Sequence, residues 1–333
     1  MQFARIGAGV MLLAVALAGA PLSAAEPVPF KIGIAAPTVN MLPLWIGKSS
    51  GVFAAHGINL EIVNTDGGSR GLAEVGQGKL QAMTVGLSAV IDANGKGGDY
   101  RLIASGANTM SFRFFGANRV INADDLRGKK VGVSAFGSES DSAALLALKQ
   151  MGLARSEVTV VESGGTLKRL QALKSGAISA TALNEPADSQ AEHDKLPLLM
   201  DLKVNQPWIF TAIVVDRKYL QSHREQVKEF LRAYIESVYL ALSNPQAGML
   251  ALAKELKDFP PEVIEATYAD FKTRVPRDAA LSREGAETML RELPGLGVAV
   301  KSKNVADYVD SSLIDELRSD GFLESVTKRY RVY

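Results

Sequence analysis

An internal repeat in the first two thirds of the chain limits the possible folds more than any other feature. The segment KIGIAAP begins at Lys31, and its counterpart KVGVSAF begins at Lys130, 99 residues later. A second pair, GGSRGLAEVGQGKLQAMTVG from Gly67 and GGTLKRLQALKSGAISATALN from Gly164, is offset by 97 residues. The nearly constant offset predicts two consecutive copies of one supersecondary arrangement.

Each copy alternates short β-branched segments with helical ones. Further strand candidates, NLEIV (59–63) and EVTVV (157–161), lie between the two matching segments of each copy. This alternation predicts an α/β fold with mainly parallel strands. Ligands of such sheets bind beyond the carboxyl ends of the strands, where loops lead into helices. Two similar halves would place two sets of these loops across a cleft, although any two strand–helix–strand units share some similarity of this kind.

The last third of the chain has a mostly helical pattern. One more strand is predicted in PWIFTAIVVDRKYL (207–220). Ser222 and Glu225 then form a capping-box pattern before a long amphipathic helix, and Pro260 and Pro261 start another helix. The Tyr and Phe stripes of these helices indicate packing on the outside of one half rather than a ligand site.

The first 25 residues have the pattern of a secretory signal peptide. Arg5 precedes the apolar run IGAGVMLLAVALAGA, and Ser23 and Ala25 supply the small residues of a cleavage site before Glu26. The run is too short for a membrane span, which favours export over a transmembrane or buried N-terminal helix. We therefore expect a periplasmic protein that is cleaved near Ala25.

Composition and missing motifs exclude several classes of protein. The 333 residues carry a formal net charge of +1, which gives no basis for binding nucleic acid or an anionic membrane. The chain has no cysteine, which excludes disulfides, thiolate metal sites, a cysteine nucleophile and a lipidated cysteine. No later apolar stretch reaches about 18 residues, so the mature chain is expected to be soluble.

The motifs of common enzymes and cofactor sites are missing as well. No Gly-Lys-Ser/Thr follows a glycine-rich loop, and there is neither a GxGxxG fingerprint nor a GxSxG elbow. The three histidines, His56, His193 and His223, are not at metal-ligand spacing. We therefore expect no cofactor, no metal and no catalytic residue, although the sequence alone leaves a Ser-His-Asp triad open.

Residues 137–141, GSESD, lie between a strand and a helix and predict a place for a small ligand. The first N–H groups of a helix are unpaired and carry a partial positive charge, so they attract an anion or a polar group. Comparable helix starts occur at 67–69 and 164–166. Alternatively, Glu139 and Asp141 only complement the dipole of their own helix.

The tripeptide NEP (184–186) ends a later strand. A residue before proline is held extended, which would direct Asn184 and Glu185 into the cleft. An ordinary turn into the next helix is an equal alternative.

Five segments together resemble the substrate-binding proteins of ABC importers, in the group that binds nitrate, sulfonates, taurine and thiamine precursors. The segments are NMLPLWIGKSSGVFAAHGINLEIV, DGGSRGLAEVGQGKLQAMTVG, DLRGKKVGVSAFGSESD, LKSGAISATALNEP and FTAIVVDRKYL. Each is weak alone, but they run in the family's order over nearly the whole mature chain.

The resemblance implies the two-lobed α/β fold of type II periplasmic binding proteins. Each lobe would hold a mixed, mainly parallel sheet flanked by helices. Lobe one would comprise residues 27–112 and 211–333, and lobe two residues 113–210. The chain would cross between the lobes near 111–116 and near 208–212.

The family's ligand lies between the lobes, against the loop after the first strand and the helix starts described above. Carried over to this chain, the resemblance implies the ligand-binding residues Asn40, Met41, Trp45, Gly68, Ser69, Ser88, Phe136, Ser138, Ser140, Asn184 and Thr211. For Trp45, core packing is an equal alternative. Arg70 either pairs with an anionic ligand or faces water.

The implied function is capture of a small sulfonate-like or nitrate-like anion and its delivery to a permease in the inner membrane, by a monomer without enzymatic activity. One departure matters, because no arginine clamp is evident and Glu139 and Glu185 would repel an anion. A neutral, zwitterionic or aromatic, pyrimidine-type ligand is therefore an alternative. Two others are an enzyme of the thiamine-precursor type on the same fold and a sensor module that presents its ligand to a receptor.

Overall fold

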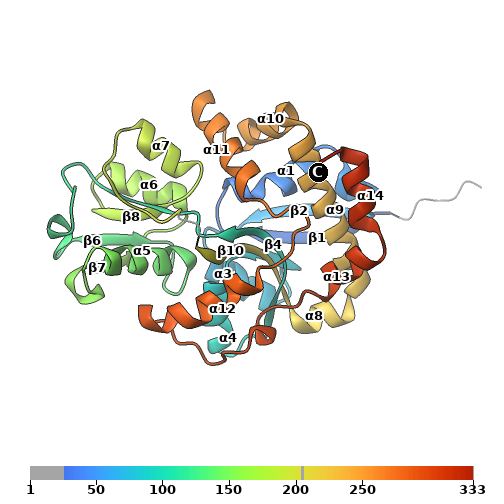
Figure 1. Cartoon of the computed structure of the whole chain (residues 1–333), viewed down its shortest axis with the longest axis horizontal. Coiled ribbons are helices and arrows are strands. Elements are labelled where there is room, and N and C mark those ends of the chain that lie inside the picture. Colours follow the sequence, from blue (N-terminus) through green and yellow to red (C-terminus); the bar gives the residue numbers. More distant parts are fainter. Residues whose placement is uncertain (1–25, 204–205, 333) are drawn as a thin grey trace, which may run out of the picture.

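The computed structural model describes residues 26–203 and 206–332, so the predicted signal peptide lies outside the described residues. The described chain forms two five-stranded sheets, which lie next to each other along the long axis of the molecule (Figure 1). We define lobe one by the first sheet and lobe two by the second.

The two sheets have the same strand order. In lobe one the order is β2 (Ile58–Asn64), β1 (Val28–Ile34), β3 (Ala82–Val85), β10 (Pro207–Asp216) and β4 (Tyr100–Thr109). In lobe two it is β7 (Thr159–Glu162), β6 (Lys130–Val133), β8 (Ala180–Leu183), β5 (Arg113–Gly116) and β9 (Leu198–Asp201). In each sheet the first three strands are parallel and the fourth is antiparallel to the third. The predicted pair of similar α/β halves with mixed, mainly parallel sheets is confirmed.

The chain crosses from lobe one to lobe two after Thr109 and enters β5 at Arg113. It returns after Asp201, and β10 begins at Pro207, which pairs with Thr109. The sequence predicts the return near 208–212, but these residues already belong to β10. The strand begins at Pro207, within the range predicted for it, and this first residue pairs with Thr109 at the end of β4. As a division into domains, the limits drawn from the sequence stay a prediction.

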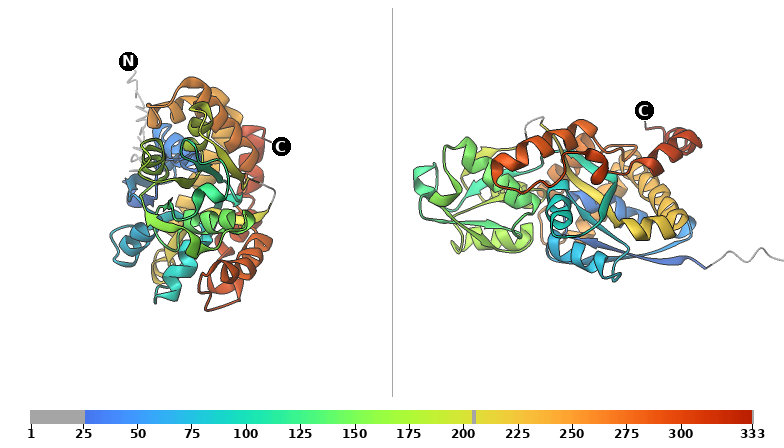
Figure 2. Two further views of the ribbon diagram at one scale, coloured as in Figure 1. Left: turned by 90° about the vertical axis from the view of Figure 1, so that its left-hand side faces the viewer. Right: turned by 90° about the horizontal axis from the view of Figure 1, so that it is seen from below.

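The C-terminal helices cover lobe one (Figures 1 and 2). They are α8 (Arg217–Ser222), α9 (Arg224–Ser243), α10 (Pro245–Glu255), α11 (Pro261–Arg274), α12 (Arg283–Glu292), α13 (Ser312–Ser319) and α14 (Phe322–Tyr330). Helix α11 also packs against α7 (Ala187–His193) of lobe two. Among the described helices, none is long and apolar enough to cross a membrane.

The ends of these helices confirm one prediction and correct another. Helix α11 begins at Pro261, as predicted. The predicted capping box of Ser222 and Glu225 is wrong, because Ser222 ends α8 and its hydroxyl donates back to the Lys218 carbonyl at 2.9 Å. His223 precedes α9 instead and makes no side-chain cap.

The remaining helices follow the strands of each half. They are α1 (Leu42–Ser49), α2 (Val52–Ala55), α3 (Gly68–Gly76) and α4 (Leu87–Gly95) in lobe one, and α5 (Glu139–Gln150), α6 (Thr166–Lys174) and α7 in lobe two. Hydrophobic clusters fill the space between these helices and the sheets. In lobe one, Phe230 of α9 stacks on Phe30 of β1 with ring centroids 4.3 Å apart. Burial of one phenyl side chain stabilises the fold by about 1.5–3 kcal/mol.

Candidate ligand-binding site

A cavity of about 100 Å³ lies between the lobes. The loops that follow the parallel strands line it, with Ala35 after β1, Gly86 after β3, Ser134 after β6 and Asn184 after β8. These loops extend from the carboxyl ends of parallel strands, where α/β proteins bind their ligands. The two sets of loops expected from the repeat therefore meet at one cavity.

Several residues predicted to bind a ligand lie on the cavity wall, namely Met41, Gly68, Ser138, Ser140, Asn184 and Thr211. They come from both lobes, so a ligand in the cavity would contact both. Their role in binding stays a prediction.

The other predicted residues are not part of the wall, namely Asn40, Trp45, Ser69, Ser88 and Phe136. Trp45 is buried in the core of lobe one, which was its alternative placement. Asn40 stands behind the wall and donates from Nδ2 to Thr211 Oγ1 at 3.3 Å. Ser88 is fully buried, and its backbone N–H donates to Glu139.

The side chains of Ser69 and Phe136 also do not line the cavity. Ser69 is the neighbour of the wall residue Gly68, but its own hydroxyl is buried and makes no hydrogen bond with the described residues. Phe136 is 48% exposed, and its ring lies 5.6 Å from Cζ of Arg155. Arg70 is exposed, so it faces water, the second of its two alternatives.

The start of α5 brings a triangle of hydroxyl groups to the cavity. Ser138 is the N-cap residue, and its Oγ accepts a hydrogen bond from the Asp141 N–H at 3.3 Å. The Oγ atoms of Ser134, Ser138 and Ser140 lie 2.9–3.0 Å from one another, and all three residues line the cavity. A hydroxyl rotates to donate or accept as needed. The triangle can therefore bond to a ligand while it caps α5.

The start of α6 presents a hydroxyl with no partner. Thr166 lines the cavity and is 3% exposed, and its Oγ1 makes no hydrogen bond with any described residue. Such a group costs about 1–3 kcal/mol when it stays unpaired. The neighbouring Gly165 N–H is engaged by Asp66 Oδ1 of lobe one at 3.3 Å. The free hydroxyl and the positive helix end together favour a ligand that accepts hydrogen bonds.

Arg169, one turn into α6, is a buried cation. It is 2% exposed and lines the cavity. Its guanidinium donates to three neutral acceptors, which are Thr181 Oγ1 at 3.1 Å, Gly164 O at 2.7 Å and Ala182 O at 3.1 Å. No carboxylate among the described residues pairs with it, and burial lowers its pKa to about 9. A guanidinium carries five N–H groups, so donors remain for a ligand.

Glu139, the first residue of α5, reaches from lobe two to lobe one along the cavity wall. Its Oε1 accepts from the Ser88 N–H at 2.6 Å, and its Oε2 accepts from the Trp208 indole N–H at 2.8 Å. No cation in the described chain pairs with it, and burial raises its pKa to about 7. The carboxyl group is therefore partly protonated at neutral pH, which weakens the repulsion of an anion expected from the sequence.

Two aromatic rings form an apolar part of the wall. Phe112 and Phe210 lie edge to face, with centroids 4.9 Å apart and an angle of 81° between their planes. Edge-to-face pairs of this kind are favourable arrangements of aromatic quadrupoles. They offer contact to an apolar or aromatic part of a ligand.

Some wall residues were not among the predicted binding residues, namely Phe112, Thr166, Arg169 and Phe210, although Thr166 belongs to a helix start that the sequence analysis named. The repeat held a signal for two of them, because its offset of 97 residues aligns Thr166 with Ser69 and Arg169 with Leu72. Leu72 is buried in lobe one, so the repeat has a cation where its other copy has a core leucine. Phe112 lies at the first crossing and Phe210 in β10, and the repeat covers neither of them.

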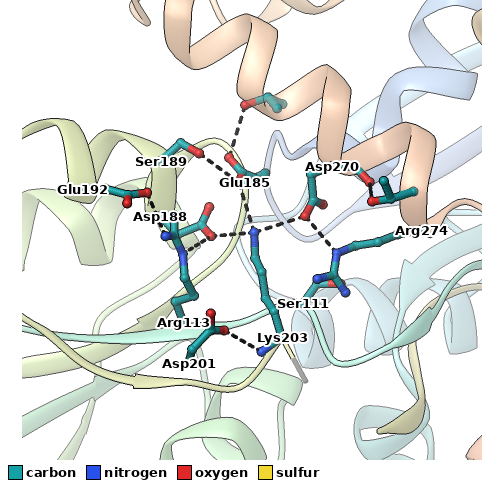
Figure 3. Close-up of polar contacts among 12 residues, drawn as sticks. Ser111, Arg113, Glu185, Asp188, Ser189, Glu192, Asp201, Lys203, Asp270 and Arg274 are labelled. Atoms are coloured by element: carbon teal, nitrogen blue, oxygen red, sulfur yellow. Dashed lines mark hydrogen bonds and ion pairs between the residues drawn. The ribbon is translucent and has the colours of Figure 1, made fainter. Parts of the chain in front are cut away.

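A second polar region between the lobes is a group of ion pairs near the crossings, which Figure 3 shows. We call it the interlobe ion cluster and define it by Arg113, Glu185, Asp188, Lys203, Asp270 and Arg274. The Lys203 Nζ lies 3.0 Å from Glu185, 2.8 Å from Asp188 and 3.1 Å from Asp270. Because Asp270 belongs to α11 of lobe one and Asp188 to α7 of lobe two, Lys203 bridges the lobes.

The other members complete the pairing. Arg113 lies 2.9 Å from Asp188, and Arg274 lies 2.8 Å from Asp270. Although burial opposes it, the carboxylates of Asp188, Glu185 and Asp270 raise the pKa of Lys203. No member lines the cavity, so Glu185, unlike Asn184, is directed away from the predicted ligand site.

The model of the family described as NMT1/THI5 like matches residues 38–248, well over half of the chain. The chain belongs to the NMT1/THI5-like family. This NMT1/THI5-like protein is 25% identical over 241 residues to the riboflavin-binding protein RibY of Chloroflexus aurantiacus, a match that covers 70% of this chain and 68% of RibY.

Solved structures agree with the fold of this NMT1/THI5-like protein. The alkanesulfonate-binding protein SsuA from Xanthomonas axonopodis pv. citri, bound to MOPS, superposes with a TM-score of 0.72 at 18% identity, over 87% of this chain and 100% of SsuA. The periplasmic nitrate-binding protein NrtA from Synechocystis PCC 6803 superposes with a TM-score of 0.69 at 13% identity, over 91% of this chain and 89% of NrtA. These likenesses confirm the predicted resemblance and the periplasmic binding protein fold.

Proposed function

We propose that this protein is the solute-binding component of an ABC importer, which captures a small anion between its lobes. It would act in the periplasm as a monomer and deliver the ligand to a permease in the inner membrane. Membership of the NMT1/THI5-like family and the binding proteins among its structural neighbours support this proposal.

The observation that favours an anion is the buried guanidinium of Arg169 at the cavity wall. It has no carboxylate partner among the described residues, and it lies one turn from the unpartnered hydroxyl of Thr166. An anion at the start of α6 would accept from this hydroxyl and compensate the charge. It would also interact favourably with the helix dipole, by up to about 2 kcal/mol in a partly buried site.

Binding would favour the closed arrangement of the lobes, because only this arrangement contacts the ligand from both sides. A micromolar dissociation constant corresponds to a binding free energy of about −8 kcal/mol. Donors from Arg169, Thr166 and the serine triangle are sufficient in number for such an affinity.

An aromatic or pyrimidine-type ligand is the second candidate. The rings of Phe112 and Phe210 on the wall and the riboflavin-binding relative favour it. The cavity of about 100 Å³ is smaller than the roughly 300–1,000 Å³ that drug-sized ligands occupy. A flavin would therefore require the lobes to open, whereas a small anion would not.

We further propose binding without turnover. The chain has no cysteine for nucleophilic catalysis, and the described residues contain no group of three or more His, Asp or Glu side chains suited to a metal ion. Chemical change of a bound candidate ligand during incubation, detected by mass spectrometry, would instead support the enzyme alternative.

The test combines mass spectrometry of the compound that co-purifies with a thermal-shift screen of nitrate, sulfonates, carboxylates, pyrimidines and riboflavin. We expect an anion to raise the melting temperature and calorimetry to give one site per chain. Replacement Arg169→Met should weaken anion binding by about tenfold to hundredfold, since a hydrogen bond to a charged group is lost.

Arg70→Met is the matched control, because Arg70 is exposed at the start of α3 and does not line the cavity. It should leave the affinity unchanged. If no anion binds, or if Arg169→Met binds anions as well as the unmodified protein, the proposed anion site is wrong. Binding of only a neutral aromatic compound would favour the second candidate.

A further inference from the structure

We propose that Glu139 determines specificity by selecting ligands that carry a cationic amine in addition to their anionic group. The proposal rests on the proposed function, because it describes the other end of the same ligand. The ligand class is then a small zwitterion, with its acid group at the start of α6 and its ammonium group against Glu139.

Buried charges of both signs line the cavity without pairing inside the protein. Within the described residues, Arg169 donates only to a hydroxyl and two backbone carbonyls. Glu139 accepts from the Ser88 backbone N–H and the Trp208 indole N–H, and it also hydrogen-bonds with the Ser88 hydroxyl, so its partners in the described chain are neutral. No ion pair between the two is present in this part of the chain. Arg169 therefore lacks an anionic partner among the described residues, and Glu139 lacks a cationic one.

Cations on or beside the helices that contribute to the Glu139 contacts have carboxylate partners of their own. On α5, Asp141 lies 3.0 Å from Arg155. On α4, which contributes Ser88 to the Glu139 contact, Asp92 lies 2.7 Å from Lys96. These cations are therefore engaged with other carboxylates. The counter-charge for Glu139 would have to come from a ligand.

Glu139 keeps acceptor capacity for such a ligand. A carboxylate offers about four lone-pair positions, and the Ser88 N–H, the Ser88 hydroxyl and the Trp208 indole N–H use three of them. An ammonium group carries three donors and no acceptor. It can donate to the remaining position of the carboxylate without displacing the contacts that join α5 to lobe one.

The cost of desolvation favours a ligand with both charges. A buried charge without a partner is unfavourable, and a buried carboxyl avoids the cost by keeping its proton. A simple anion would compensate Arg169 but leave Glu139 protonated. A zwitterion would compensate both groups. The cavity volume of about 100 Å³ favours a small zwitterion over a large one.

The experiment compares three matched series of probes by isothermal calorimetry. These are ω-amino acids from glycine to 5-aminopentanoate, the carboxylates of the same chain length without the amine, and the alkylamines without the acid. We expect one amino acid to bind at least about tenfold more tightly than its carboxylate, since a charge-assisted hydrogen bond is added. The amines alone should bind weakly or not at all.

Glu139→Gln should remove this preference, so that the amino acid and its carboxylate bind equally, whatever the absolute affinity of the variant. A purely structural role of Glu139 would weaken both probes by the same factor. Glu162→Gln is the matched control, because Glu162 accepts from the Phe136 N–H beside α5 but does not line the cavity. It should keep the preference.

Proton release gives an independent readout. Near pH 7 the Glu139 carboxyl is partly protonated, so an ammonium group that binds it should expel the proton. Calorimetry in two buffers of different ionisation enthalpy should detect release with the amino acid, less or none with the carboxylate, and none in Glu139→Gln.

The outcomes separate this proposal from the proposed function. Equal affinity for the amino acids and carboxylates in the unmodified protein, or a preference that persists in Glu139→Gln, overturns the role of Glu139 and leaves an anion-binding protein. Failure of every anionic and zwitterionic probe to bind overturns both.

Discussion

The cavity and the interlobe ion cluster both place buried charges between the lobes, but the charges have different partners. In the cluster, Lys203 contacts three carboxylates within 3.1 Å. In the cavity, Arg169 and Glu139 contact only neutral groups of the described chain. A buried charge without a partner destabilises the folded protein. A buried ion pair does so mainly when one of its two partners is removed. The charges of the cluster are thus compensated without a ligand, whereas the charges of the cavity are not.

The largest effect expected from this comparison is the loss of stability on removing Lys203. Replacement Lys203→Met leaves Glu185, Asp188 and Asp270 without their shared cation. Breaking a buried pair in this way should lower the free energy of unfolding by about 3–5 kcal/mol. Urea unfolding monitored by circular dichroism measures the loss.

A surface pair provides the control for this prediction. Lys174 lies 2.6 Å from Asp194, but its side chain is 41% exposed, against 13% for Lys203. Lys174→Met should therefore cost only about 0–1 kcal/mol. A similar loss for both variants would show that the cluster does not hold the lobes together.

A smaller effect concerns pH and the unpaired Glu139. Burial raises its pKa from an ordinary value of 4.5 to about 7. Between these values the folded protein holds a proton that the unfolded chain has released. The contribution of Glu139 to stability is therefore fully present below pH 4.5 and is lost as the pH rises towards 7.

We expect Glu139→Gln to flatten this part of the pH profile, measured by urea unfolding at intervals from pH 4.5 to 8. Glu265→Gln, on the exposed side of α11, should leave the profile unchanged. If Glu139→Gln and the unmodified protein lose stability in parallel, the carboxyl is ionised in the folded protein and the contrast with the cluster is weaker than described.

No loss of stability is expected for Thr166→Val. The variant replaces an unpartnered hydroxyl by a methyl group of similar size, so the free energy of unfolding should stay the same or rise by up to about 1–3 kcal/mol. Anion affinity should nevertheless fall by severalfold, because a donor to the ligand is lost.

Thr181→Val is the matched comparison. The Thr181 hydroxyl donates to the Gly132 carbonyl at 2.8 Å and accepts from Arg169, so its loss should cost about 1–3 kcal/mol. A large loss of stability in Thr166→Val would mean that its hydroxyl has a partner in solution, and the site would then need no ligand to complete it.

The fold was predictable to the extent that it follows local patterns. The repeat predicted two halves of the same layout, and the sheets have the same strand order. Ser138 and Ser140 reached the cavity because they start a helix directly after a parallel strand, which is a local property. The position of Trp45 was not decided by its own segment, because the packing of α1 against α9 buries it.

The charges between the lobes depend on contacts that no short segment encodes. Lys203 meets Asp270, 67 residues away, and Glu139 meets Trp208, 69 residues away. The sequence showed that Glu139 was near the site but gave no partner for it, so its charge was overestimated. Arg169 was detectable only as a cation aligned with the buried Leu72 in the other copy of the repeat.

The pairing of Thr109 with Pro207 has a consequence for how such proteins can change. Strands β4 and β10 are antiparallel neighbours, about 4.8 Å apart, so lobe two is an insertion at the open end of a hairpin. Arg169 and Glu139 both belong to the inserted part. Recombination at this one pair of residues would exchange lobe two, together with Arg169 and Glu139, and leave the sheet of lobe one unchanged.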